Sequence, residues 1–150
     1  MTVPLAAVPP VATSGTVLGF DFGAKRIGVA VGEHQVGLAH PLATIDGEDR
    51  EHRFAAIDKL VAEWQPASLV LGLPLATDGS EHEMTRRARR FARQLQARYR
   101  IEVKFIDERY TSAAAEEQLR AQHVDLRRNK AAIDAAAAQI ILQEYFDAAV

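Results

Sequence analysis

The segment from residue 17 to residue 31, VLGFDFGAKRIGVAV, places two runs of strand-forming residues on either side of one short turn that contains glycine. The first run ends at Asp21, and Lys25 and Arg26 follow in the turn. A carboxylate at the point where a strand leaves the core is unfavourable unless a positive group meets it. The segment therefore predicts a β-hairpin that presents Asp21 as a candidate functional acid. The alternative is that Asp21 only caps backbone amides of the turn.

Composition limits the classes of protein that this chain can belong to. Its 150 residues are 48% hydrophobic, which is enough for one compact domain with a core. The absence of cysteine excludes a disulfide framework, a thiolate metal site and thiol catalysis. The net charge of −2 means that any contact with nucleic acid must come from a local basic patch. We expect a domain at 16–150 of a cytoplasmic protein with no membrane contact, preceded by a flexible extension at 1–15.

The hydrophobic periodicity predicts an α/β fold. Strands are expected at 16–21, 26–32, 36–44, 68–74 and 102–107. Helices are expected at 49–64, at 81–98 after an N-cap at Ser80, from Thr111 or Ser112 to 120, and at about 129–146. This succession predicts a mixed five-stranded sheet in the order 3-2-1-4-5, with strand two antiparallel and helices on both faces.

Two more acids lie at unusual positions. Glu108 directly follows the strand at 102–107, so it projects from a strand end as Asp21 does. With strand one beside strand four, both ends lie at the same edge of the sheet, within reach of each other. Asp134 begins an otherwise apolar stripe of the last helix, so we expect its side chain to face the sheet.

Three converging carboxylates predict a metal site, because they repel one another unless a cation lies between them. Mg²⁺ or Mn²⁺ fits such oxygen ligands, and two ions about 4 Å apart would suit phosphodiester hydrolysis. Gly23 would let a phosphate approach Asp21 closely. Other roles remain open: Glu108 can pair with Arg109 or Lys104, and Asp134 can be an acid of the helix's first turn.

The chain carries local clusters of positive charge that suit a phosphate backbone. Seven arginines fall between residues 86 and 100, and helical spacing places on the solvent side Arg86, Arg89, Arg90, Arg93 and Arg100. The alternative is a solvated helix face paired with Glu81 and Glu83. A second group surrounds the start of the last helix and consists of Arg120, Arg127, Arg128 and Lys130. Lys25 and Arg26 can hold a flanking phosphate or balance the charge of Asp21.

Several segments resemble motifs of the YqgF/RuvX family of bacterial RNase H-like proteins, which are described as pre-16S rRNA nucleases or Holliday-junction-resolvase-like enzymes. These are LGFDFGAKRIGVA at 18–30, LGLP at 71–74, DGS at 78–80, DER at 107–109 with Thr111, and Asp134 with the apolar residues after it. The resemblance implies an RNase H-like fold with Asp21, Glu108 and Asp134 as metal-binding acids. It adds Arg109 and Thr111 to the candidate nucleic-acid contacts. The chain departs from the family at Gly32, often serine there, and in the loop around 76–83, which lacks the usual asparagine and Gly-Pro.

The expected function is that of an endonuclease that uses Mg²⁺ or Mn²⁺, as two ions, on structured nucleic acid. The resemblance favours 5′-end maturation of pre-16S rRNA. One alternative is a Holliday-junction resolvase, which needs a homodimer for two matched cuts. Another is an inactive nucleic-acid-binding adaptor. An ATP-binding phosphotransferase is disfavoured, because such enzymes close two lobes on the nucleotide and 150 residues supply one.

Overall fold

A computed structural model describes residues 15–109, 111–122 and 129–148. The described residues form five strands and four helices in the expected order. They are β1 (Thr16–Phe22), β2 (Arg26–Glu33), β3 (Ala39–Asp46), α1 (Arg50–Trp64), β4 (Ser68–Leu73), α2 (Glu83–Tyr99), β5 (Val103–Asp107), α3 (Thr111–Ala121) and α4 (Lys130–Ala148). The expected extension at 1–15 lies outside the described residues except for Gly15. Within the described parts of the chain, no helix has the length and apolar character needed to cross a bilayer.

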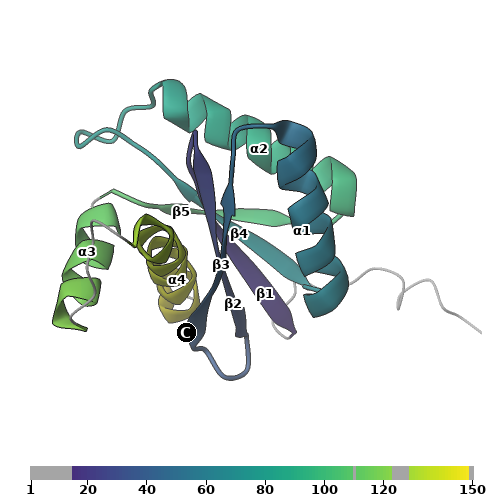
Figure 1. The fold of residues 1–150 in the computed structure, drawn as a ribbon, viewed down its shortest axis with the longest axis horizontal. Coiled ribbons are helices and arrows are strands. Elements are labelled where there is room, and N and C mark those ends of the chain that lie inside the picture. Colours follow the sequence, from purple (N-terminus) through teal and green to yellow (C-terminus); the bar gives the residue numbers. More distant parts are fainter. Residues whose placement is uncertain (1–14, 110, 123–128, 149–150) are drawn as a thin grey trace, which may run out of the picture.

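The strands form one sheet in the order β3-β2-β1-β4-β5, which confirms the prediction (Figure 1). β2 runs antiparallel to β1 and β3, whereas β4 and β5 run parallel to β1. Pro41 lies in the edge strand β3, where a missing N–H costs no inter-strand bond on the open side. The ends of β1, β4 and β5 that carry Asp21, Leu73 and Asp107 consequently lie at one edge of the sheet.

The helices cover both faces of the sheet. α1 and α2 lie on one face and α4 on the other, with α3 packed on the outer side of α4 (Figure 1). Alternation along β1 directs Leu18 and Phe20 into the core under α1 and α2, and Val17 into the core under α4. Asp21 therefore faces α4, whereas Phe22, the next residue, faces α1 and α2.

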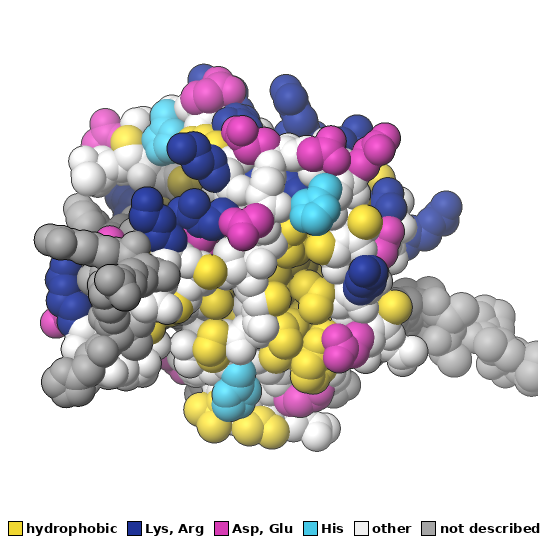
Figure 2. Space-filling view, in the orientation of Figure 1, with side chains coloured by type: hydrophobic (Ala, Val, Ile, Leu, Met, Phe, Trp, Pro, Cys, Tyr) yellow, Lys and Arg dark blue, Asp and Glu magenta, His cyan; other side chains and the backbone are white. Residues whose placement is uncertain are grey.

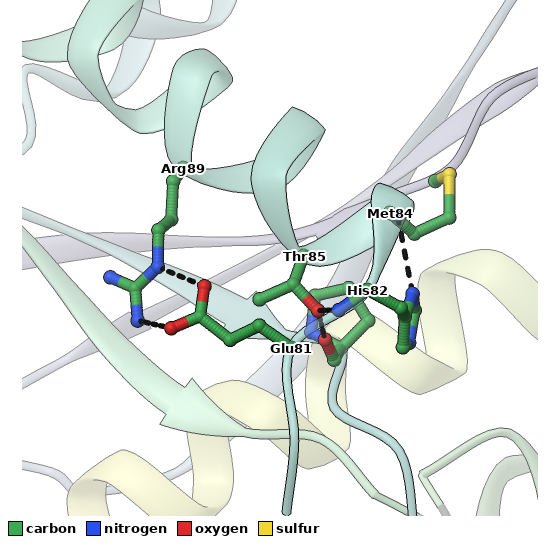
Figure 3. A network of polar contacts seen from close by, with 6 residues as sticks. Glu81, His82, Met84, Thr85 and Arg89 are labelled. Carbon is green, nitrogen blue, oxygen red and sulfur yellow. Dashed lines mark hydrogen bonds and ion pairs between the residues drawn. The ribbon is translucent and has the colours of Figure 1, made fainter.

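The start of α2 differs from the prediction. His82, not Ser80, is the N-cap, because the Ser80 amide and hydroxyl both donate to the Asp78 carboxylate. The His82 ring accepts a hydrogen bond from the amide of Met84, and the Thr85 hydroxyl accepts one from the amide of His82 (Figure 3). This reciprocal cap uses residues of the loop in which the chain departs from the family pattern.

One other boundary also differs. The third strand begins at residue 39 instead of 36, and Val36 and Leu38 before it are exposed. α3 begins at Thr111, one of the two starts that the sequence predicted.

Candidate active site

Asp21 and Glu108 meet at the edge of the sheet where β1 and β5 end. The amide of Glu108 donates to the carbonyl of Leu73 at 3.2 Å, which holds residue 108 beside the end of β4. The two side chains share a hydrogen bond, in which the Glu108 carboxyl donates to the Asp21 carboxylate. Burial, followed by the charge of Asp21, raises the pKa of Glu108 to about 10. Burial also raises the pKa of Asp21, and the charge of Asp134 raises it further.

Glycines on both strands that flank β1 make room for these acids. Gly28 lies in β2 directly opposite Asp21 of β1, and a Cβ on Gly28 would lie 2.0 Å from the backbone oxygen of Asp134. Gly72 follows the β4 residue that pairs with Phe20, and a Cβ there would lie 2.5 Å from Glu108 Oε2. A side chain at either position would displace α4 or the Glu108 carboxyl. Gly23 has a different constraint from the one expected: its Cβ would meet the Arg26 carbonyl at 2.5 Å, which reflects turn closure.

Asp134 lies near this pair but forms an ion pair with Arg26. It occupies the second turn of α4, beyond the turn in which the helix dipole would account for an acid, and its charge contributes to raising the pKa of Asp21. Its Oδ2 accepts a hydrogen bond from Arg26 Nε at 2.6 Å, with both side chains partly exposed. Among the described residues, no three histidine or acidic side chains are arranged as a metal-binding group. The structure therefore brings together Asp21 and Glu108, and it places Asp134 beside them in an ion pair.

The donor set suits a hard divalent cation. Asp21 and Glu108 offer only carboxylate oxygens, which Mg²⁺ and Mn²⁺ prefer, and the raised pKa values of both groups mean that a positive charge between them would stabilise the pair. Asp134 can add a third carboxylate if Arg26 releases it.

The predicted cationic contacts near the acids have different surroundings. Lys25 is exposed on the β1–β2 turn, and Lys130 is exposed at the start of α4. Arg109 donates to the Asp107 carboxylate and, at 3.2 Å, to the carbonyl of Thr77. Arg127, Arg128 and the side chain of Thr111 lie outside the described residues.

The four predicted arginines of α2 divide into two pairs. Arg89 makes a bidentate contact with Glu81 at 2.8 and 3.0 Å (Figure 3). Arg86 contacts Glu83 at 3.1 Å. For these two, the alternative of a solvated, internally paired face is correct in part. Arg90 and Arg93 are exposed and form no ion pair with the described residues.

Sequence reasoning missed Arg53, which fixes the turn after Asp21. Its guanidinium donates to the carbonyls of Gly23 and Ala24, both at 2.8 Å, and to Gly47 at 2.7 Å. The side chain is only 6% exposed and lies over the ring of Phe22. A signal was present, because an arginine four residues before Ile57 lies on the apolar face of α1, where a charge requires buried partners.

Comparison with known proteins assigns the family. A family profile described as "RuvX: Holliday junction resolvase" matches residues 15–148. The chain belongs to this family. A RuvX relative from Thiobacillus denitrificans, named "Putative pre-16S rRNA nuclease", is 59% identical over 136 residues and covers 91% of this chain and 94% of its own. A protein of the same name from Dechloromonas aromatica is 56% identical over 133 residues, covering 89% and 91%.

Solved structures confirm the fold of this RuvX chain. RuvC of T. thermophilus in complex with Holliday junction substrate superposes with a TM-score of 0.57 at 15% identity, covering 90% of this chain and 95% of that chain. Fowlpox virus resolvase with Holliday junction DNA also gives a TM-score of 0.57, at 10% identity and with 90% and 99% covered. At such low identities these likenesses establish the RNase H-like fold alone.

Proposed function

We propose that this RuvX chain is a divalent-metal-dependent endonuclease that hydrolyses phosphodiester bonds of precursor 16S rRNA. The observation that carries the proposal is the Asp21–Glu108 pair, which is partly buried where the strands end. Desolvation raises the pKa of both groups, and a neighbouring carboxylate adds to each shift, Asp134 for Asp21 and Asp21 for Glu108. The hydrophobic clusters of the core consist of apolar side chains, and partial burial of two carboxylates side by side is unfavourable for folding. Clustered perturbed acids of this kind are typical of catalytic sites.

The residues present have distinct roles in this proposal. Asp21 and Glu108 would hold Mg²⁺ or Mn²⁺, with two ions as the expected number, and Asp134 would complete the ligand set. When bound, the metal stabilises negative charge on the attacking and leaving oxygens of the phosphodiester that water cleaves. Arg26, once released from Asp134, would bind a substrate phosphate next to the acids. Lys25 and Lys130, both exposed, would hold the backbone on either side without reading bases.

The relatives' names favour RNA over junction DNA as the substrate. The curated relatives at 48–59% identity carry the name of a pre-16S rRNA nuclease, whereas the family description and the solved resolvases name Holliday junctions. Resolution of a four-way junction requires two symmetric cuts and hence a two-fold dimer, whereas one domain can cut an RNA alone.

The decisive experiment offers the purified protein labelled precursor 16S rRNA and a synthetic four-way junction, each with and without Mn²⁺. We expect cleavage of the RNA only with the metal. Asp21→Asn should lower that rate by about 100-fold or more, since several kcal/mol of charge stabilisation are lost. Asp147→Asn, a change of the same kind at the far end of α4, is the matched control and should cut normally. Faster cutting of the junction would favour the resolvase alternative, and cleavage of neither would favour the inactive adaptor.

A further inference from the structure

A groove lined by arginines lies between α1 and α2, on the sheet face opposite Asp134. It consists of two adjoining hollows of about 140 and 430 Å³, which share Arg50, Phe54, Arg90 and Gln94. We call it the basic groove, and its cations are Arg50, Arg53, Arg87, Arg90, Arg93 and Arg98. In Figure 1 the two helices lie side by side on their face of the sheet.

Positive charge in the basic groove is only partly neutralised. Arg98 pairs with Asp58 at 2.7 Å, and Glu48 is the acid among the lining residues. Within the described parts of the chain, Arg50, Arg90 and Arg93 form no ion pair. Burial, with a further contribution from the charge of Arg87, lowers the pKa of Arg53. Crowded like charges of this kind are relieved by a bound anion.

The floor of the groove is aromatic but closed to stacking. Phe54 and Phe91 are 5% and 3% exposed, so nucleobases cannot stack on them. Arg50 and Arg98 already lie over the Phe54 ring, at 5.8 and 5.2 Å from its centroid. The groups available to a ligand are therefore guanidinium forks, which bind phosphate oxygens and not bases.

The groove opens at the same end of the sheet as the acids. Phe22 lines the smaller hollow and directly follows Asp21 in β1, but it faces the opposite side of the sheet. The β1–β2 turn, which Arg53 fixes, lies between the two places and carries the exposed Lys25. This end of the sheet is at the top of Figure 2, where charged side chains gather above the hydrophobic ones over β2 and β3.

We infer that one strand of the nucleic-acid substrate continues from the acids over the β1–β2 turn and lays its phosphates in the basic groove. The inference rests on the proposed nuclease function for the identity of the polyanion. It assigns binding to Arg50, Arg90 and Arg93, and it makes Arg86 and Arg89, which are paired with glutamates, minor contributors.

The test measures binding of fluorescein-labelled precursor 16S rRNA by fluorescence anisotropy, at several salt concentrations and in an Asp21→Asn background that prevents cleavage. Arg90→Glu with Arg93→Glu should weaken binding about tenfold or more and reduce the slope of log K against log salt by about 2. Lys59→Glu, on the exposed side of α1 outside the groove, should change affinity less than about twofold. Circular dichroism checks that each variant is folded.

Two further arms separate the groove from general electrostatics. If Arg86→Glu weakens binding as much as Arg90→Glu, the whole exposed face of α2 attracts RNA by nonspecific electrostatics, and the inference is wrong. Substrates trimmed on one flank should become insensitive to the Arg90 and Arg93 reversals, because a short strand cannot reach the groove; equal sensitivity at all lengths would also overturn it. Inorganic tripolyphosphate that binds the groove without displacing the RNA would show that the site takes a free phosphate ligand instead.

Failure of the groove and failure of the nuclease proposal give different results. With Asp21 intact, the Arg90 and Arg93 reversals should raise KM and leave kcat unchanged, because these residues do not touch the reacting phosphate. A protein that binds through the groove but never cleaves would contradict the nuclease proposal alone. A protein that cleaves normally whatever the charge at residues 90 and 93 would contradict the groove alone.

Discussion

At the scale of single residues, the unusual feature is a pair of acidic side chains that the fold holds together despite desolvation and repulsion. Asp21 and Glu108 come from strands that are 80 or more residues apart in sequence but end at one edge of the sheet. The predicted meeting of these two strand ends is confirmed. Their role as metal ligands stays a prediction, as does that of Asp134.

Replacement of Asp21 by Asn should stabilise the metal-free protein in a pH-dependent way. Raised folded-state pKa values mean that the wild type loses stability as pH rises from about 4.5 towards about 10, whereas at low pH both carboxyls are protonated in both states. The variant's melting temperature should exceed that of the wild type by roughly 3 °C near pH 8, because about 1 kcal/mol of unfavourable carboxylate burial and repulsion is removed. Near pH 4 the difference should vanish. Thermal melts in a chelator measure both, and a difference independent of pH would contradict the raised pKa values of the pair.

Arg26 should compete with metal for Asp134. Arg26→Met breaks the 2.6 Å ion pair and should cost the metal-free protein about 1 kcal/mol. The stabilisation produced by Mn²⁺ should then be larger than in the wild type, because Asp134 is available to the metal. Lys25→Met removes the same charge from the neighbouring exposed position and separates the ion pair from net charge. A Mn²⁺-induced shift in melting temperature that is equal in Arg26→Met and Lys25→Met would argue against competition.

At the scale of elements, the first hairpin depends on helix α1 for its shape. Arg53 connects α1 to the carbonyls of the β1–β2 turn and of the loop after β3. The turn therefore keeps its form through a contact that is thirty residues distant in sequence. Periodicity located the hairpin and the helix correctly, but the helical pattern alone does not show which carbonyls the buried arginine meets.

Arg53→Leu should be strongly destabilising. Three carbonyls lose their charged donor, which we expect to cost about 3 kcal/mol and lower the melting temperature by roughly 6–12 °C. Urea unfolding followed by circular dichroism measures the change. Lys59→Leu, an exposed position on the same helix, should stay within about 0.5 kcal/mol of the wild type. If the two variants were equally stable, the hydrogen bonds of Arg53 would not be what holds the turn in place.

At the scale of the whole molecule, charge is distributed over two faces that meet at one end of the sheet. The acids face α4, and the basic groove lies between α1 and α2. A net charge of −2 is compatible with nucleic-acid binding only because the cations are gathered locally. This arrangement suits a substrate strand that wraps around the sheet edge.

The domain boundary expected near residue 16 predicts that a chain shortened to 15–150 folds unaided. The family match also begins at residue 15, and the carbonyl of Gly15 accepts a hydrogen bond from the amide of His34. We expect the melting temperature of the shortened chain to lie within about 2 °C of the full chain, and metal-dependent cleavage to be retained. A large loss of stability would show that residues 1–14 belong to the domain.

The sequence by itself determined the strand order, the two faces covered by helices, and the meeting of Asp21 with Glu108. These follow from local periodicity and from topological rules that leave few arrangements for such a succession of elements. Only the tertiary structure decided that Asp134 pairs with Arg26 and that Arg53 holds the turn. It also decided that Arg86 and Arg89 pair with glutamates, whereas Arg90 and Arg93 form no ion pair with the described residues. The reason is that a long charged side chain can reach several partners. Which ion pair forms depends on distances and burial in the folded protein, and the spacing of residues along the chain does not encode these.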